Sequence, residues 1–360
     1  MQSSNEKVLF VRSAFLGDFA VCLPTINQIV IDQNLSPSNI FFVIFNNNGT
    51  NPVKAFFGES HIFTKNTTIV NLHRTKMFLS LKNFLFVNRN AQIDKIIYLP
   101  TWGDSFKGQI MKYLIIRLRF GALTKSFGFF KFSKKHKSIV SQYLHPFSAL
   151  NLCWNKNYNC LGLLQIEKNK CRREKKTILV YPNSKLVMKV WPMENYACLI
   201  NKIQGFEDCE ILLIGGAEDY EYNESLLGIC SKVENISNIA GSLRVNETIE
   251  LMRDSDMFIG NDGFPMHLAA LSDLPSIGLF TYKNPVGCWD PIIASKMVTI
   301  TASAICKECY LSDCPNPVCL TSIGVETVFR VYRNMIENDA VKYNEIVKHT
   351  DILHKDLHFK

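Results

Sequence analysis

The stretch DMFIGNDGFPMHLAALSDLPSIGLF, residues 256–280, decides the fold of this chain. Its apolar run Met257–Gly260 has the length and composition of a buried strand, and Asn261–Gly263 is a turn signal. A helix is predicted over Pro265–Leu271, because proline suits the first helical turn, where its missing N–H costs nothing. A second buried strand is predicted at Pro275–Phe280. Strand, glycine turn, helix and strand in this order predict half of a doubly wound nucleotide-binding unit.

The polar residues of this stretch follow its first strand. Asp262 and His267 would lie at the carboxyl end of that strand, where open α/β sheets bind ligands. A helix that begins there offers unpaired N–H groups and a positive dipole end to a phosphate. A tight turn with a capping aspartate and a packed histidine explains the same residues equally well.

The rest of the chain alternates strands and helices, which predicts parallel sheets. The first block is the strand Lys7–Arg12, a Gly17–Asp18 turn and an amphipathic helix over Phe19–Ile31. Further strands are predicted at 40–45, 93–99, 177–181 and 210–214, and further helices at 108–119, 246–254 and 326–336, with one more beginning at 189–192.

Two α/β domains are predicted, because 360 residues are too many for one ordinary core. The charged run Glu167–Lys176 has no apolar periodicity and indicates a linker. We expect a first Rossmann-like domain over 1–170, a second over 171–335 and a polar C-terminal tail over 336–360. The two domains would face each other across a cleft.

Three sets of polar residues would meet at that cleft: Asp18 from the first half, Ser184 and Lys189 from the second, and the 262–267 turn. A carboxylate opposite a phosphate-binding wall predicts transfer from a phosphate-activated donor. The carboxylate would take the proton of an acceptor hydroxyl, while cations and amides would hold the leaving diphosphate. Taken singly, Lys189 would be an ordinary surface lysine, so the prediction depends on the whole set.

Composition and charge limit the partners. The chain is 47% apolar and 20% charged, without an apolar run long enough to span a bilayer. No signal-peptide pattern opens it, so we expect a cytoplasmic protein whose 12 cysteines are mostly reduced. The net charge is +8, and the window Ser105–Ile166 holds ten Lys and Arg with no Asp or Glu. This basic window suits a nucleic acid, an anionic membrane surface or a phosphorylated acceptor, and a solvated basic face is the alternative.

Four segments, in the same order, resemble glycosyltransferase family 9, the bacterial ADP-heptose:lipopolysaccharide heptosyltransferases. They are VLFVRSAFLGDFAVCLPTINQI (8–29), YPNSKLVMKVWPMENYACLI (181–200), ILLIGGAEDYE (211–221) and FIGNDGFPMHLAALSDLPSIGLF (258–280). The resemblance implies a GT-B fold, with the acceptor on the first Rossmann-like domain and the nucleotide sugar on the second. It also implies inverting transfer without a catalytic metal.

The resemblance further implies roles for single residues. Asp18 matches the family's proposed general base, Lys189 the lysine on the donor phosphates, and Ser184 its hydroxyl neighbour. Asp262 and His267 match the family's Asn-Asp-Ser-Gly-Pro-Met-His segment, which wraps the diphosphate and the sugar. The nucleoside contact of the family falls at Glu218 or Glu221.

This chain departs from the family at Gly263–Phe264, where the family usually has Ser-Gly. A bulky ring replaces the residue that lets a phosphate approach the backbone, and a hydroxyl is lost. We expect Gly263 to take over the close approach one residue earlier, because glycine has no Cβ. The change leaves the donor sugar and its nucleotide open.

A cysteine cluster lies in the loop 306–319. Four thiolates on so short a loop can bind a metal tetrahedrally, as in a zinc knuckle, although the knuckle's glycines are absent. Similar segments occur in family 9, and some of its protein-glycosylating members hold iron there. A structural zinc or iron site and plain reduced thiols are the open alternatives. The four residues are Cys306, Cys309, Cys314 and Cys319.

The sequence thus predicts an inverting transferase that moves heptose, or a related sugar, from ADP-heptose or a similar nucleotide sugar to lipopolysaccharide or another anionic surface glycan. It would work in the cytoplasm, peripheral to the inner membrane, without nucleic acid. A protein-modifying heptosyltransferase and a GT-B sugar-nucleotide epimerase are alternatives. A nucleic-acid-binding protein is a third, but it leaves Asp18, Lys189 and Asp262 unexplained.

Overall fold

The computed structural model describes residues 4–13, 16–73, 75–86, 92–99, 106–120, 125–127, 164, 175–281, 296–302, 314, 317–337 and 346–349. The chain divides into two compact units, Met1–Ile166 and Glu167–Lys360. The division falls at the start of the charged run 167–176. The cleft between the two domains stays a prediction.

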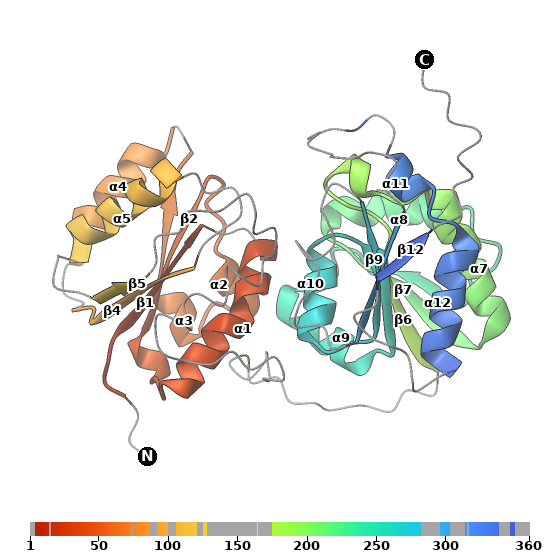
Figure 1. Ribbon diagram of the computed structural model, residues 1–360, viewed down its shortest axis with the longest axis horizontal. Coiled ribbons are helices and arrows are strands. Elements are labelled where there is room, and N and C mark those ends of the chain that lie inside the picture. The colour runs from red at the N-terminus through yellow and green to blue at the C-terminus, as the bar shows by residue number, and fades with distance from the viewer. Residues whose placement is uncertain are drawn as a thin grey trace. The chain divides into compact units, whose positions relative to one another are not determined.

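The first unit is a parallel sheet with helices on both faces (Figure 1). Its strand order, β3-β2-β1-β4-β5, is that of a Rossmann fold. The strands are β1 (Val8–Ser13), β2 (Ile40–Asn46), β3 (Thr67–Asn71), β4 (Lys95–Leu99) and β5 (Lys125–Phe127). The helices are α1 (Leu16–Asp32), α2 (Pro52–Phe57), α3 (Ile62–Lys65), α4 (Met77–Phe86) and α5 (Phe106–Phe120), with a 3-10 turn, η1, at Pro37–Asn39.

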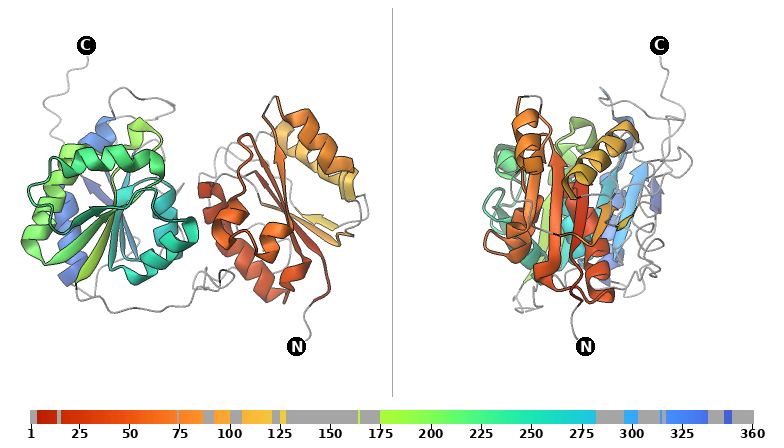
Figure 2. Two further views of the ribbon diagram at one scale, coloured as in Figure 1. Left: turned by 180° about the vertical axis from the view of Figure 1, so that it is seen from behind. Right: turned by 90° about the vertical axis from the view of Figure 1, so that its left-hand side faces the viewer.

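The two faces of this sheet carry separate cores, and β2 shows why, since alternate side chains of a strand point to opposite faces. Phe42 contacts Phe19 of α1 and Phe63 of α3, with ring centroids 6.1 and 5.8 Å apart. Val43 belongs to the other core, with Phe84 of α4 and Ile116 of α5. A near-continuous apolar strand such as IFFVIF is therefore what a sheet covered on both sides requires. Figure 2 shows these layers from two further directions.

The second unit is a larger parallel sheet of order β12-β11-β10-β9-β6-β7-β8. It repeats the doubly wound plan, because the strand order reverses between β6 and β9. The strands are β6 (Lys176–Tyr181), β7 (Cys209–Leu213), β8 (Ile236–Asn238), β9 (Met257–Asn261), β10 (Ser276–Phe280), β11 (Met297–Ala302) and β12 (Ile346–His349). The helices are α7 (Met193–Phe206), α8 (Tyr220–Leu227), α9 (Val245–Asp254), α10 (Phe264–Leu271), α11 (Val318–Thr321) and α12 (Val325–Glu337), with 3-10 turns η3 (Val187–Lys189) and η4 (Ala217–Asp219).

The strand–turn–helix–strand prediction for residues 256–280 is confirmed by β9, α10 and β10. All ten residues of these two strands are buried, as expected for central strands of a parallel sheet. The helix predicted to begin at 189–192 differs, since a 3-10 turn ends at Lys189 and α7 begins only at Met193. The predicted tail contains β12, which pairs with β11 at the sheet edge.

Candidate active site

The predicted donor-site residues of the second unit gather at its switch point. Ser184 follows β6, and Asp262 and Gly263 follow β9, its hydrogen-bonded neighbour. Carboxyl ends of parallel strands share one edge, and ligands bind where the strand order reverses. The topology therefore places these loops where a doubly wound sheet binds its ligand.

Lys189 and Asp262 form a buried ion pair at this edge. The Lys189 Nζ lies 2.5 Å from the Asp262 Oδ2, and the two side chains are only 15% and 4% exposed. Lys189 ends η3, and Asp262 comes directly after β9. A charge that is largely removed from water requires a partner, and each of these two groups supplies one to the other. Their low exposure separates both from ordinary solvated side chains. The structure brings together these two predicted residues, and it excludes the surface-lysine interpretation of Lys189.

Asn261 holds the surrounding loops together, and sequence reasoning treated it only as part of a turn. Its Oδ1 accepts hydrogen bonds from the Trp191 backbone N–H (3.2 Å) and the Tyr196 hydroxyl (3.0 Å). Its Nδ2 donates to the carbonyls of Pro182 (2.9 Å) and Asn183 (3.3 Å). One fully buried amide thus fixes the loop after β6 and the start of α7 against β9. Its position between an apolar strand and an aspartate was the available signal.

A second network joins the loops after β6 and β7. The Asn183 side chain accepts from the Ser184 N–H and donates to the Asp219 Oδ1, both at 2.8 Å. The Gly216 N–H donates to the other Asp219 oxygen at 2.8 Å. Burial raises the pKa of Asp219, while these two hydrogen bonds oppose the shift. Asp219, which the sequence did not single out, therefore connects the loop after β6 to the loop after β7.

The two predicted nucleoside contacts differ from Asp219 in exposure. Glu218 in η4 and Glu221 in α8 are both exposed to solvent. The Glu218 Oε1 lies 4.0 Å from the Nζ of Lys185, which is itself exposed. An exposed carboxylate beside the loop after β7 is accessible to a ligand. The choice between Glu218 and Glu221 stays open.

Gly263 leaves room for a tyrosine ring. It precedes the first residue of α10 with extended backbone, and an added Cβ would lie 2.8 Å from Cε1 of Tyr181. Tyr181 ends β6 and is 5% exposed. Burial, and then the negative charges of Asp219, Glu218 and Asp262, raise its pKa well above the usual value, so its hydroxyl stays protonated as a donor. Sequence reasoning missed this tyrosine, although an aromatic residue at a strand's carboxyl end was visible.

His267 lies inside α10, four residues after Gly263, and is buried. Helix α10 begins with Phe264 and Pro265, so the first helical turn has one N–H fewer to offer. Its N-terminus still follows Asp262 directly, next to the Lys189–Asp262 pair.

Asp18 lies in the first turn of α1 rather than in the preceding loop, and its side chain is half-buried. The Arg12 Nη2 donates to the Asp18 carbonyl oxygen at 2.6 Å, which connects the end of β1 to this turn. A carboxylate in a first turn is favoured by the positive end of the helix dipole. The role of Asp18 as a base stays a prediction.

The predicted metal site falls largely outside the described residues, since Cys306 and Cys309 are not among them. Cys314 and Cys319 are half-buried thiols. Over the described part of the chain, no three His, Cys, Asp or Glu side chains are grouped as metal ligands would be. The zinc or iron site stays a prediction.

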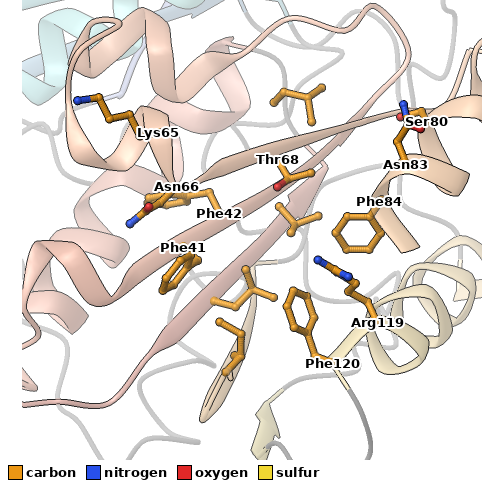
Figure 3. Close-up of a pocket in the computed structure, with 14 residues that line it drawn as sticks. Phe41, Phe42, Lys65, Asn66, Thr68, Ser80, Asn83, Phe84, Arg119 and Phe120 are labelled. Atoms are coloured by element: carbon orange, nitrogen blue, oxygen red, sulfur yellow. The ribbon is translucent and has the colours of Figure 1, made fainter. Parts of the chain in front are cut away.

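The first unit contains a separate cavity of about 410 Å³ between its sheet and helices α4 and α5 (Figure 3). Asn66, Ser80, Asn83 and Arg119 supply polar groups to a wall that is otherwise largely apolar. Arg119 lies over the ring of Phe84, 5.9 Å from its centroid. None of the predicted site residues lines this cavity, so it is distinct from the candidate active site.

Comparisons with known proteins agree with this geometry. Residues 145–318 match the model of glycosyltransferase family 9 (heptosyltransferase). Lipopolysaccharide heptosyltransferase 1 of Campylobacter coli is 30% identical over 130 residues, which are 34% of this chain and 38% of that protein. Lipooligosaccharide heptosyltransferase 2 of Campylobacter jejuni is 22% identical over 92% of this chain and 99% of its own length.

The structure is similar to that of the Escherichia coli ADP-heptose LPS heptosyltransferase II, with a TM-score of 0.60 and 19% identity over 92% of this chain and 98% of that one. The predicted fold class, α/β of the GT-B type, is confirmed. The parallel sheets, the switch-point site and this likeness define a GT-B protein. More narrowly, residues 145–318 match glycosyltransferase family 9, and the chain is similar to the heptosyltransferases of that family.

Proposed function

We propose that this protein transfers heptose, or a closely related sugar, from a nucleotide diphosphate donor to a lipopolysaccharide or similar surface glycan, with inversion at the anomeric carbon. The buried Lys189–Asp262 pair at the β6/β9 switch point carries the proposal. A cation held out of water beside a helix N-terminus is suited to the charge of a leaving diphosphate.

On this proposal the donor lies along the carboxyl edge of the second sheet. Its diphosphate contacts Lys189 and the backbone at Gly263, while Ser184 and His267 contact the phosphates and the sugar. Glu218 contacts the nucleoside from the exposed loop after β7. Asp262 already neutralises Lys189 in the free protein, so an incoming phosphate competes with a carboxylate for the same ammonium group. Asp262 is then available for the sugar hydroxyls.

The chemistry requires one proton transfer and one displacement. The oxygen of the acceptor hydroxyl attacks the anomeric carbon, and Asp18 accepts the proton of that hydroxyl. The bond from the anomeric carbon to the diphosphate breaks at the same time. Lys189 stabilises the negative charge that develops on the departing phosphate oxygen. This requires Asp18 of the first unit to approach the bound donor, as the predicted cleft would allow.

The proposed acceptor is an anionic glycolipid, and the proposed location is the cytoplasmic side of the inner membrane. The match to the family 9 model and the heptosyltransferase relatives support the acceptor class. The excess of Lys and Arg over Asp and Glu supports a negatively charged partner.

The experiment is a thermal-shift screen of the purified chain against ADP-, UDP- and GDP-sugars, with the matching sugar 1-phosphates as controls. A ligand at 100 times its Kd stabilises the folded state by about 2.7 kcal/mol, so the true donor should raise the melting temperature clearly. The donor found is then assayed with lipid extracts and protein acceptors separately. Transfer to a lipid-linked glycan supports the proposal. Transfer only to protein, or no response to any nucleotide sugar, contradicts it.

A further inference from the structure

Helices α4 and α5 lie side by side on one face of the first sheet (Figure 1). Both helices expose large apolar side chains to solvent. Phe78 and Leu79 of α4 are 80% and 63% exposed, and Leu118 of α5 is 74% exposed. We call this surface the α4–α5 face. Its members are Met77, Phe78, Leu79, Ile110, Met111, Leu114 and Leu118.

The face is a stripe rather than a scatter of single residues. In α5, Met111, Leu114 and Leu118 are spaced three and four residues apart, so they lie on one side of the helix. Ile115 and Ile116 of the same helix are buried against the sheet. A surface helix normally turns charged residues to water on the side away from its core. Helix α5 is apolar on both sides, which indicates that the stripe has a partner.

All the charged residues within these two helices are basic. Neither α4 nor α5 contains Asp or Glu. Lys76 and Lys82 are exposed, and each is three residues from Leu79, so both border the apolar side chains. A helix pair with an apolar face, bordering lysines and no acid is suited to the boundary between lipid headgroups and acyl chains.

We propose that the α4–α5 face docks this protein onto an anionic lipid bilayer, with the apolar side chains in the acyl boundary and Lys76 and Lys82 among the phosphates. Among the described helices none is long and apolar enough to cross a membrane, so the contact would be in the plane of the surface. A second copy of the chain is a poorer occupant. A symmetric contact would enclose the lysines of both copies, and neither helix of the pair has an acidic residue to neutralise them.

The inference goes beyond the proposed sugar transfer, because it assigns a membrane contact to named residues outside the candidate active site. It differs from the basic-window prediction, because only α5 lies within residues 105–166 and the two bordering lysines lie outside that window. Because vesicle binding requires neither donor nor acceptor, its failure would be separate from a failure of the transferase proposal.

The test is co-sedimentation of the full chain with vesicles of phosphatidylcholine, with or without phosphatidylglycerol. The double variant Phe78→Ser/Leu118→Ser should lower the partition coefficient on anionic vesicles about tenfold. Lys76→Gln/Lys82→Gln should lower it about fivefold per lysine at low salt, and little on neutral vesicles. The control is Ile229→Ser/Val233→Ser, which removes exposed apolar side chains of the second unit and should leave binding unchanged.

All the substituted side chains are exposed, so unfolding is not expected, and melting curves of the variants verify this. Equal vesicle binding by the wild type, Phe78→Ser/Leu118→Ser and the control would overturn the proposal. A second result would also overturn the proposal: the wild type self-associates, Phe78→Ser/Leu118→Ser abolishes this self-association, and vesicle binding does not depend on anionic lipid. The occupant of the face would then be a second copy of the chain.

Discussion

The two units share one topology but differ in where their polar and apolar groups lie. Around the switch point of the second unit, Asn261, Asp262 and Asp219 are buried, and Lys189 is largely so. All four are bonded to one another or to neighbouring loops. In the described part of the first unit, most of the exposed large apolar side chains belong to the α4–α5 face. The same topology thus carries a bonded polar cluster at one switch point and an exposed apolar face on the helices of the other sheet, which is the difference that the two proposals interpret.

The difference arises outside the strands. Both sheets are parallel and wound in the same order about their central strands, so both provide a switch point. In the second unit, side chains such as Asn261 tie the loops to the strands and fix the polar groups. In the first, Arg12 anchors the backbone of the turn that carries Asp18. We therefore expect substitutions to separate donor binding, which we propose for the second unit, from acceptor activation and docking, which we propose for the first.

The largest expected effect is on turnover. Asp18→Asn should lower the rate of transfer by about 10²- to 10⁴-fold, because it removes the base that accepts the hydroxyl proton. Donor affinity should be unchanged, since the proposed donor site lies on the other unit. Asp32→Asn, at the exposed end of the same helix, is the matched control and should keep full activity.

The next effect is on folding stability. Trp191→Ala should lower the free energy of unfolding by about 3–5 kcal/mol, because a fully buried indole and its N–H bond to the Ile323 carbonyl are lost. Phe42→Ala in the first unit should cost about as much. Urea unfolding measures both losses. Only Trp191→Ala should also weaken donor binding. If Phe42→Ala weakens donor binding equally, the proposal that the second unit alone binds the donor is contradicted.

A smaller effect is expected from Gly263→Ala. Its new Cβ would lie 2.8 Å from the Tyr181 ring, so the ring or the start of α10 must move. The cost should be about 1–3 kcal/mol in stability, with weaker donor binding. Gly205→Ala in α7 is the control, because nothing lies within 4 Å of the added methyl group. If both variants bind donor like the wild type, Gly263 is not part of the donor site.

The smallest effect depends on pH. Burial raises the pKa of Asp219 above its ordinary 3.8, so the folded state disfavours its ionised form. The free energy of unfolding of the wild type should therefore fall, relative to that of Asp219→Asn, as the pH rises from the pKa of Asp219 in the unfolded chain through its higher pKa in the folded state. Unfolding curves of the two proteins between pH 4 and pH 7 measure the difference. A difference that stays constant over this range would contradict the assignment.

Sequence patterns were sufficient where an element is long and strongly patterned. The apolar runs of β9 and β10 and the helix between them were predicted within one residue at most ends. The short strands β5 and β8, of three residues each, were missed because they carry too few residues to show a period. The edge strand β3 was missed because polar residues make up much of TTIVN.

The charged residues of the candidate site could be predicted from the sequence, but the hydrogen bonds that hold the surrounding loops in place could not. Lys189 and Asp262 were selected from the sequence, and they are paired. The hydrogen bond from Trp191 to Asn261 joins residues 70 positions apart, and no local pattern reports such a contact. The α4–α5 face was also invisible, because the sequence does not tell which side of α5 is packed against the sheet.

The most direct test is a calorimetric titration of the donor, or of its free nucleotide diphosphate, into the wild type, Lys189→Met and Lys185→Met. Lys185 lies in the same loop but is 87% exposed, so it is a matched control. A buried charged hydrogen bond contributes about 1.5–3 kcal/mol, so Lys189→Met should weaken binding roughly ten- to a hundredfold while Lys185→Met stays close to the wild type. If all three proteins bind with the same affinity, the diphosphate is not held at the β6/β9 switch point.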